Sequence, residues 1–141
     1  MRLFLIITML GISFFDFRYY IIPDLFHVIL VFSRMVISDS MKEFYFACLN
    51  GIAIAFPLIL LRYLMNRILH QECMGDGDIK LVFSFSIYFH LLHDLYALLF
   101  ASVIGLCMSL LYLRKKERMI PFGPCICGGF LIMMLMRTKL F

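Results

Sequence analysis

Two aspartates in this sequence stand where a carboxylate is costly, and together they could perform hydrolysis. Asp16 lies inside the apolar run that opens the chain, and Asp78 ends the segment "GDGD" directly before the apolar run "IKLVFSFSIYF". An ionised aspartate at the centre of a membrane helix costs about 2.5–3.5 kcal/mol, so such residues usually face a polar interior and are functional. Two facing carboxylates can share one proton, so that one activates a water while the other protonates the leaving group. This pairing predicts general acid–base cleavage of a peptide bond.

Each aspartate also has a plainer interpretation. Asp16 can be a solvated helix end paired with Arg18 or another loop cation, and Asp78 can be an N-cap after a glycine turn. Gly75 and Gly77 suit such a turn because glycine permits backbone conformations and close approaches that other residues do not. A calcium loop is disfavoured because the acidic pattern is too short. In a second class of function, a small transporter or assembly subunit, the same aspartates would bind a proton or cation or stabilise helix packing.

The composition places the chain in a membrane. Of 141 residues, 64% are hydrophobic and 16% are charged, and the mean hydropathy is +0.99, whereas soluble domains are nearer half apolar and a quarter charged. We therefore expect an integral membrane protein with the lipid bilayer as its partner. The net charge of +4 comes without a basic run flanked by aromatic residues, so no nucleic-acid partner is expected.

The metal-ligating residue types show no metal pattern. The five cysteines contain no C-x-x-C pair, so the usual zinc and thioredoxin spacings are missing, and we expect small buried hydrophobic side chains. The four histidines lack metal spacing too, and His90 and His93 are expected at the outer membrane interface. The sequence thus predicts neither a metal site nor a cofactor.

Six apolar runs predict an all-α bundle of about six transmembrane helices, forming a single domain over residues 1–141. A span needs about 20 mostly apolar residues, Pro23 suits the first turn of the second helix, and His93–Asp94 is expected to mark a tight turn. The second and fourth runs are short, so tilt or a thinner local bilayer is expected. The opening run lacks a small-residue cleavage site and is expected to be a retained span. The expected helices are residues 1–22, 23–38, 44–64, 79–92, 95–113 and 122–136.

Positive charge predicts the orientation. Asp16, "MGDGDIKL" and "RKKER" are separated by two spans each, so all three fall on one side of the membrane. That side carries eight basic residues against five on the other, which favours it as cytoplasmic. The N-terminus would then lie outside, and a site built from Asp16 and Asp78 would lie near the cytoplasmic face. The eight are Arg18, Arg62, Arg67, Lys80, Arg114, Lys115, Lys116 and Arg118, and the five are Arg2, Arg34, Lys42, Arg137 and Lys139.

Three segments carry a resemblance to a known family. They are "FFDFRYYIIPD", "MGDGDIKL" and "IPFGPCICGG". They occur in the order found in the family, and the number of spans between them agrees with the family as well. They resemble the aspartate, arginine and Ile-Pro-Asn stretch, the G-x-G-D-hydrophobic-Lys-Leu stretch and the Pro-Phe-Gly-Pro stretch of the type IV prepilin peptidases. That family, with the related preflagellin peptidases of archaea, comprises GxGD membrane aspartyl proteases. G-x-G-D alone is weak, whereas the three segments together are specific and span nearly the whole chain.

The resemblance implies an aspartic-type endopeptidase of the cytoplasmic membrane with Asp16 and Asp78 as its catalytic dyad. It implies that Gly75 and Gly77 shape the turn and that Lys80 orients a carboxylate or meets lipid headgroups. The implied substrate is a prepilin or pseudopilin with a short basic leader and a hydrophobic helix, cut at the cytoplasmic face, typically just after a glycine. The remaining site-shaping residues are Pro23, Phe122, Gly123 and Pro124, of which the last three would pack the last helix against the site.

Two residues depart from the family pattern. Asp24 stands where Asn usually follows Ile-Pro, and Asp76 stands where an uncharged residue usually separates the two glycines. These carboxylates would either perturb the pKa values of the dyad or be solvated, and with Glu72 they could meet the basic leader. Many bacterial members also carry a cytoplasmic domain that N-methylates the new pilin end. The chain offers no room for it, so we expect peptidase activity without methyltransferase activity.

Overall fold

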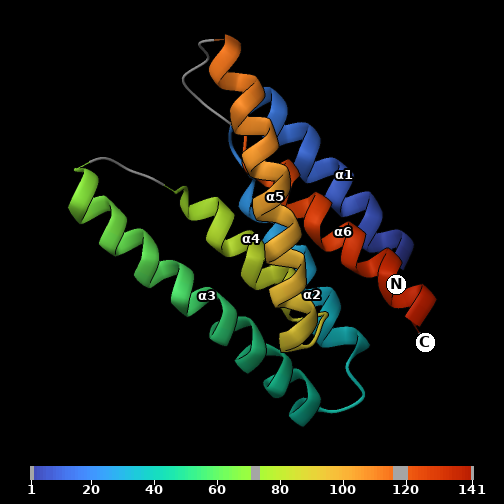
Figure 1. Ribbon diagram of the computed structural model, residues 1–141. Helices are drawn as coiled ribbons and strands as arrows, with labels where there is room; N and C mark the ends of the chain where they lie inside the picture. The colour runs from blue at the N-terminus through green and yellow to red at the C-terminus, as the bar shows by residue number, and fades with distance from the viewer. Residues whose placement is uncertain (1, 71–73, 116–120, 141) are drawn as a thin grey trace. The chain divides into compact units, whose positions relative to one another are not determined.

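The computed structural model describes residues 2–70, 74–115 and 121–140, with the side chains of residues 112–115 and 137–140 excepted. Over these residues the fold is all-α with six helices, as the sequence predicts (Figure 1). The chain divides into two compact units, one formed by residues 1–23 and 92–141 and the other by residues 24–91. Each unit is described below by itself. The expected single domain stays a prediction.

The first unit contains α1 (Arg2–Tyr19), α6 (Gly123–Leu140) and all but the first residue of α5 (Leu91–Lys115). In it α1 lies beside α6 (Figure 1). A close backbone contact joins α6 to α5, because a Cβ at Gly129 would collide with the Ala97 carbonyl and with the amide and side chain of Ala101. Small residues allow such approaches between membrane helices, where packing rather than the hydrophobic effect drives association.

The second unit contains α2 (Asp24–Ile37), α3 (Met41–Leu69) and α4 (Asp76–Ser86), and α4 packs against both other helices (Figure 1). Leu81, Val82 and Phe85 of α4 are fully buried. The ring of Phe83 rests on Gly51 of α3, where an added Cβ would lie 2.9 Å from two ring carbons. The short helix α4 is thus the buried element of this unit.

Side chains from other helices end α4 six residues before the expected boundary at residue 92. Asn50 Nδ2 donates to the Ser86 carbonyl at 2.9 Å and to the Phe89 carbonyl at 3.1 Å, and Arg34 Nε donates to the Ile87 carbonyl at 2.9 Å. The last carbonyls of a helix lack partners within it, and in a membrane each must find one in the protein. These caps allow a short helix inside the unit.

Several other boundaries differ from expectation, among them those of α5 and α3. The expected tight turn at His93–Asp94 is wrong, because α5 already begins at Leu91 and places Asp94 in its first turn, where the helix dipole favours a carboxylate. The helix α3 is longer at both ends than residues 44–64. It begins at Met41 because the Ser40 side chain accepts a hydrogen bond from the Glu43 amide, and it continues to Leu69.

The described helices have the surface of a membrane protein. Two of them, Met41–Leu69 and Leu91–Leu111, are long and apolar enough to cross a bilayer, and Gly123–Met136 is a shorter apolar helix. Many large apolar side chains point outward, such as Leu3 at 76% exposure and Ile68 at 69%. A soluble monomer rarely exposes such continuous apolar surface. Of the cysteines, Cys125 and Cys127 are buried, Cys48 is half-buried and Cys107 is exposed, so burial holds for only part of the set; Cys73 lies outside the described residues.

Candidate active site

Asp16 is a buried carboxylate in the last turn of α1. Leu5, Met9, Ile12 and Asp16 form one buried stripe, with spacings of three and four residues that place them on one helix face. Asp16 is only 6% exposed, so the interpretation as a solvated helix end is wrong. The Arg18 guanidinium, its expected partner in that interpretation, lies 5.8 Å from the centroid of the Tyr19 ring instead.

The first residue of α6 holds the Asp16 carboxylate. The Gly123 amide donates a hydrogen bond of 2.8 Å to Asp16 Oδ2, across a sequence separation of 107 residues. The first amides of a helix have no partner within it and carry the positive end of the helix dipole, so a carboxylate is favoured there. Glycine is needed for the approach, because a Cβ at position 123 would lie 2.7 Å from Oδ2 and 3.2 Å from the Asp16 Cβ.

The residues around Gly123 build this helix start. The Phe122 carbonyl accepts from the Cys125 and Ile126 amides at 3.0 and 3.1 Å, so Phe122 caps α6. Pro124 falls in the first turn, where its missing N–H is no loss. The tip of the Phe122 ring lies against Gly105 of α5, since a Cβ there would be 3.1 Å from the ring. The start of α6 thus lies against Asp16 through Gly123, and the expected role of Phe122, Gly123 and Pro124 in packing this helix against an active site stays a prediction.

Asp78 lies in the first turn of α4, half-buried. The N-cap is Gly75, not Asp78, so the N-cap interpretation of the aspartate is wrong. A Cβ at Gly75 would lie 3.4 Å from Asp78 Oδ2, so the carboxylate faces back over the helix start, where the dipole favours negative charge. Within the described residues no glycine has a positive φ. Gly75 is extended, with φ −69° and ψ 148°, and Gly77 is already helical, so the segment turns without the left-handed conformation.

The two extra carboxylates each pair with a cation of the second unit. Lys80 Nζ lies 2.7 Å from Asp24 Oδ1, which joins the start of α2 to the first turns of α4. The expected role of Lys80 stays a prediction. Pro23 directly precedes this turn of α2. Asp76 pairs with Arg62 of α3, and this guanidinium holds the pKa of Asp76 below its ordinary value. Glu72, the third acid expected near a basic leader, lies outside the described residues.

The candidate residues are distributed over both units. Asp16, Phe122, Gly123 and Pro124 belong to the first unit, with Pro23 at its edge, and Gly75, Gly77, Asp78 and Lys80 belong to the second. The structure brings Asp16 to Gly123 and Asp78 to Gly75. The meeting of Asp16 with Asp78 stays a prediction, as do the roles of all these residues.

Comparison with known proteins decides the family. The model of the type IV leader peptidase family matches residues 3–110, which include Asp16 and Asp78. The chain belongs to the type IV leader peptidase family. The resemblance drawn from three short segments is confirmed by this match. The segment around Gly123 lies beyond the matched residues, so its contact with Asp16 is an independent observation.

Two curated relatives agree with the family. The chain is 28% identical over 135 residues to a prepilin leader peptidase/N-methyltransferase of Legionella pneumophila, a match that covers 89% of this chain and 46% of the relative. It is 32% identical over 95 residues to a protein of the same name from Haemophilus influenzae, covering 66% of this chain and 37% of the relative. The chain thus spans less than half the length of either relative. No solved structure matches the chain.

Sequence reasoning missed a polar pair next to Lys80. His27 of α2 is buried at 7% exposure, and its Nδ1 lies 3.3 Å from Ser84 Oγ of α4. The only signal was a histidine inside the apolar run "LFHVILVF", because a histidine in such a run needs a polar partner from another helix. The family's three motifs do not include it.

Proposed function

We propose that this protein is a membrane-embedded aspartic endopeptidase that removes the short basic leader of type IV prepilins or pseudopilins. Membership of the leader peptidase family supports the substrate class. The observation that carries the mechanism is the Asp16 carboxylate, which is buried in the first unit and, among the described residues, is held by the Gly123 amide with no ion pair to a cation. A carboxylate kept in place without a neutralising charge is suited to take a proton from water.

In the proposed reaction Asp16 and Asp78 share one proton. The ionised member takes a proton from a water, whose oxygen attacks the scissile carbonyl carbon, and the protonated member stabilises the resulting oxyanion. The intermediate then collapses as the C–N bond breaks, and the amine of the apolar segment takes a proton from the dyad. The Gly123 amide binds Oδ2 of Asp16, which leaves Oδ1 for the proton. No cofactor enters the scheme.

The proposed location is the cytoplasmic membrane, with the dyad near the cytoplasmic face and the N-terminus outside. The bias of basic residues supports this orientation. A substrate helix in the bilayer would present the junction between leader and helix at this depth. We further propose that the chain acts as a peptidase without methyl transfer, which mass spectrometry of the cleaved product in the presence of S-adenosylmethionine would test by looking for a methyl group.

Co-expression with a candidate prepilin tests the proposed function. Leader removal, read by intact mass and N-terminal sequencing, should be lost in Asp16→Asn and in Asp78→Asn and kept in Asp76→Asn, the matched control in the same motif. Leader removal that survives either of the first two substitutions makes the dyad assignment wrong. If no prepilin is processed but proton uptake into liposomes depends on Asp16 and Asp78, the transporter interpretation replaces the peptidase.

A further inference from the structure

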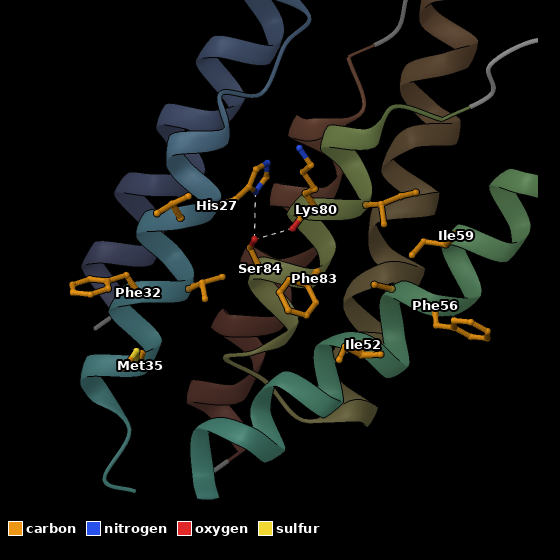
Figure 2. A pocket seen from close by; sticks show the side chains of 13 residues that line it. His27, Phe32, Met35, Ile52, Phe56, Ile59, Lys80, Phe83 and Ser84 are labelled. Carbon is orange, nitrogen blue, oxygen red and sulfur yellow. Dashed lines mark hydrogen bonds between the residues drawn. The ribbon is translucent and has the colours of Figure 1, made fainter. Parts of the chain in front are cut away.

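A groove of about 670 Å³ lies between α2 and α3 with α4 at its base (Figure 2). Its size falls within the roughly 300–1,000 Å³ typical of binding clefts. Along most of its length the lining is apolar, with Phe32 and Met35 from α2 and Ile52 and Phe56 from α3. All of its lining residues belong to the second unit. A groove of this kind suits the apolar face of a helix.

One end of the groove is polar. His27, Lys80 and Ser84 line this end, and Figure 2 shows the hydrogen bonds that join the ring of His27 to Ser84 and Ser84 to the main chain of Lys80. Lys80 is already paired with Asp24. The Lys80 ammonium is therefore already bound to a carboxylate of the chain. At the polar end of the groove, His27 is the side chain considered for binding a ligand.

The hydrogen bonds assign the proton on His27. Ser84 Oγ donates to the Lys80 carbonyl at 2.8 Å, so its one hydrogen is used and it accepts from His27 Nδ1–H at 3.3 Å. In the neutral ring, Nε2 then carries a lone pair and acts as an acceptor. This Nε2 is buried, and the described part of the chain supplies no partner for it. A buried polar atom without a partner is costly, which points to a ligand that donates a hydrogen bond.

A helix that enters the groove with its N-terminus at the polar end supplies such donors. The first four N–H groups of every helix lack partners within it, and in a membrane they must find acceptors on the protein. The phosphate of a lipid headgroup brings acceptors only, so it does not match a lone pair on Nε2. The ammonium of an ethanolamine headgroup would also donate, so the peptide helix is preferred because the proposed function supplies such a substrate, and a phospholipid is an outcome of the test.

We propose that the groove receives the apolar helix of the substrate, with its N-terminal turn at His27, whose Nε2 accepts a main-chain N–H. This inference rests on the proposed leader peptidase function and names where that substrate lies. In this arrangement the apolar side chains of the substrate helix lie along Phe32, Ile52 and Phe56. The junction between the leader and the substrate helix lies beside the first turns of α4. His27 is a binding residue here and takes no part in the chemistry.

Photo-crosslinking tests the groove without relying on cleavage. The full-length Asp78→Asn chain in liposomes is mixed with a synthetic prepilin peptide that carries a basic leader and a diazirine in its apolar segment. The cross-links, mapped by mass spectrometry, are expected on α2 and α3 at Phe32, Ile52 and Phe56. Labelling confined to other surfaces overturns the proposal, as does a groove that a diazirine phospholipid labels and the peptide does not.

Matched substitutions give the second readout, made in the otherwise wild-type chain. Ile59 and Leu60 are neighbours on α3 with 51% and 50% exposure, but only Ile59 lines the groove. Ile59→Trp should raise KM several-fold while Leu60→Trp leaves it unchanged. His27→Phe should raise KM by about 3- to 10-fold through one lost hydrogen bond, and His27→Gln, whose amide oxygen also accepts, should restore it. The proposal is overturned if Ile59→Trp and Leu60→Trp change KM equally, or if His27→Phe and His27→Gln do.

The groove and the peptidase can fail separately. If the wild-type chain cleaves the peptide but the peptide does not label the groove of the Asp78→Asn chain, the proposed function stands. The proposal that the groove binds the substrate helix is then wrong. If the peptide labels the groove of the wild-type chain but no prepilin is cleaved, the proposed function is wrong. The groove is then a peptide-binding site that serves a purpose other than leader removal.

Discussion

Replacing Gly123 by alanine is the most direct perturbation of the candidate site. The added Cβ would lie 2.7 Å from Asp16 Oδ2 and 3.1 Å from its Cγ. Ordinary contacts of these atoms begin near 3.4 Å, and the Asp16 Cβ, at 3.2 Å, belongs to the stiff base of the side chain. The carboxylate must therefore move away from α6 by several tenths of an ångström. The expected consequence is loss of the 2.8 Å bond from the Gly123 amide.

The size of the effect follows from the kind of bond lost. A hydrogen bond to a charged group contributes about 1.5–3 kcal/mol, which corresponds to a rate factor of about 10- to 100-fold. A misplacement near 1 Å of a catalytic group has a cost of about the same size. Because the substrate's helix would be held elsewhere, the loss should appear in kcat with little change in KM.

The assay is cleavage of a synthetic prepilin peptide by the reconstituted full-length chain, with thermal stability in detergent measured in parallel. Gly75→Ala is the matched control, because a Cβ there meets Asp78 Oδ2 at 3.4 Å, an ordinary contact, and the backbone is extended with φ −69°. It should keep most of the activity. A Gly123→Ala chain that cleaves at the wild-type rate, or a Gly75→Ala chain that loses as much, would refute the reasoning.

Three further predictions concern charge and packing. Asp24→Asn should cleave at close to the wild-type rate, because its pair with Lys80 is exposed, at 73% and 53% for the two side chains, and exposed pairs contribute little; a large loss in the peptide assay would contradict this. Asp76→Asn should behave likewise in the same assay, since the Asp76 side chain is 75% exposed, and an inactive variant would transfer the catalytic role to this residue. Gly129→Leu should lose about 1–3 kcal/mol through overpacking against Ala101, visible as a lower melting temperature in detergent, and an unchanged melting temperature would show that α5 and α6 separate readily.

The features that were predictable from the sequence are those encoded locally. The apolar runs gave six helices, and the two aspartates stood out because a carboxylate in or beside such a run is costly. The end of α4 was not predictable, because its caps come from Asn50 and Arg34, 36 and 53 residues from the carbonyls they bind. The bond from Gly123 to Asp16 crosses 107 residues and leaves no mark on the local pattern of either segment. The family resemblance anticipated that Gly123 matters, and the close approach explains why.

The two candidate aspartates and the two extra carboxylates are stabilised in different ways. Each of the two candidate aspartates lies at the N-terminal end of a helix, Asp16 against α6 and Asp78 in the first turn of α4. The helix dipole favours a carboxylate at both positions. Lys80 and Arg62 bind Asp24 and Asp76, the two residues that depart from the family pattern. Both of these carboxylates are mostly exposed, and exposed pairs contribute little to stability, which is why replacing either one should leave cleavage almost unchanged.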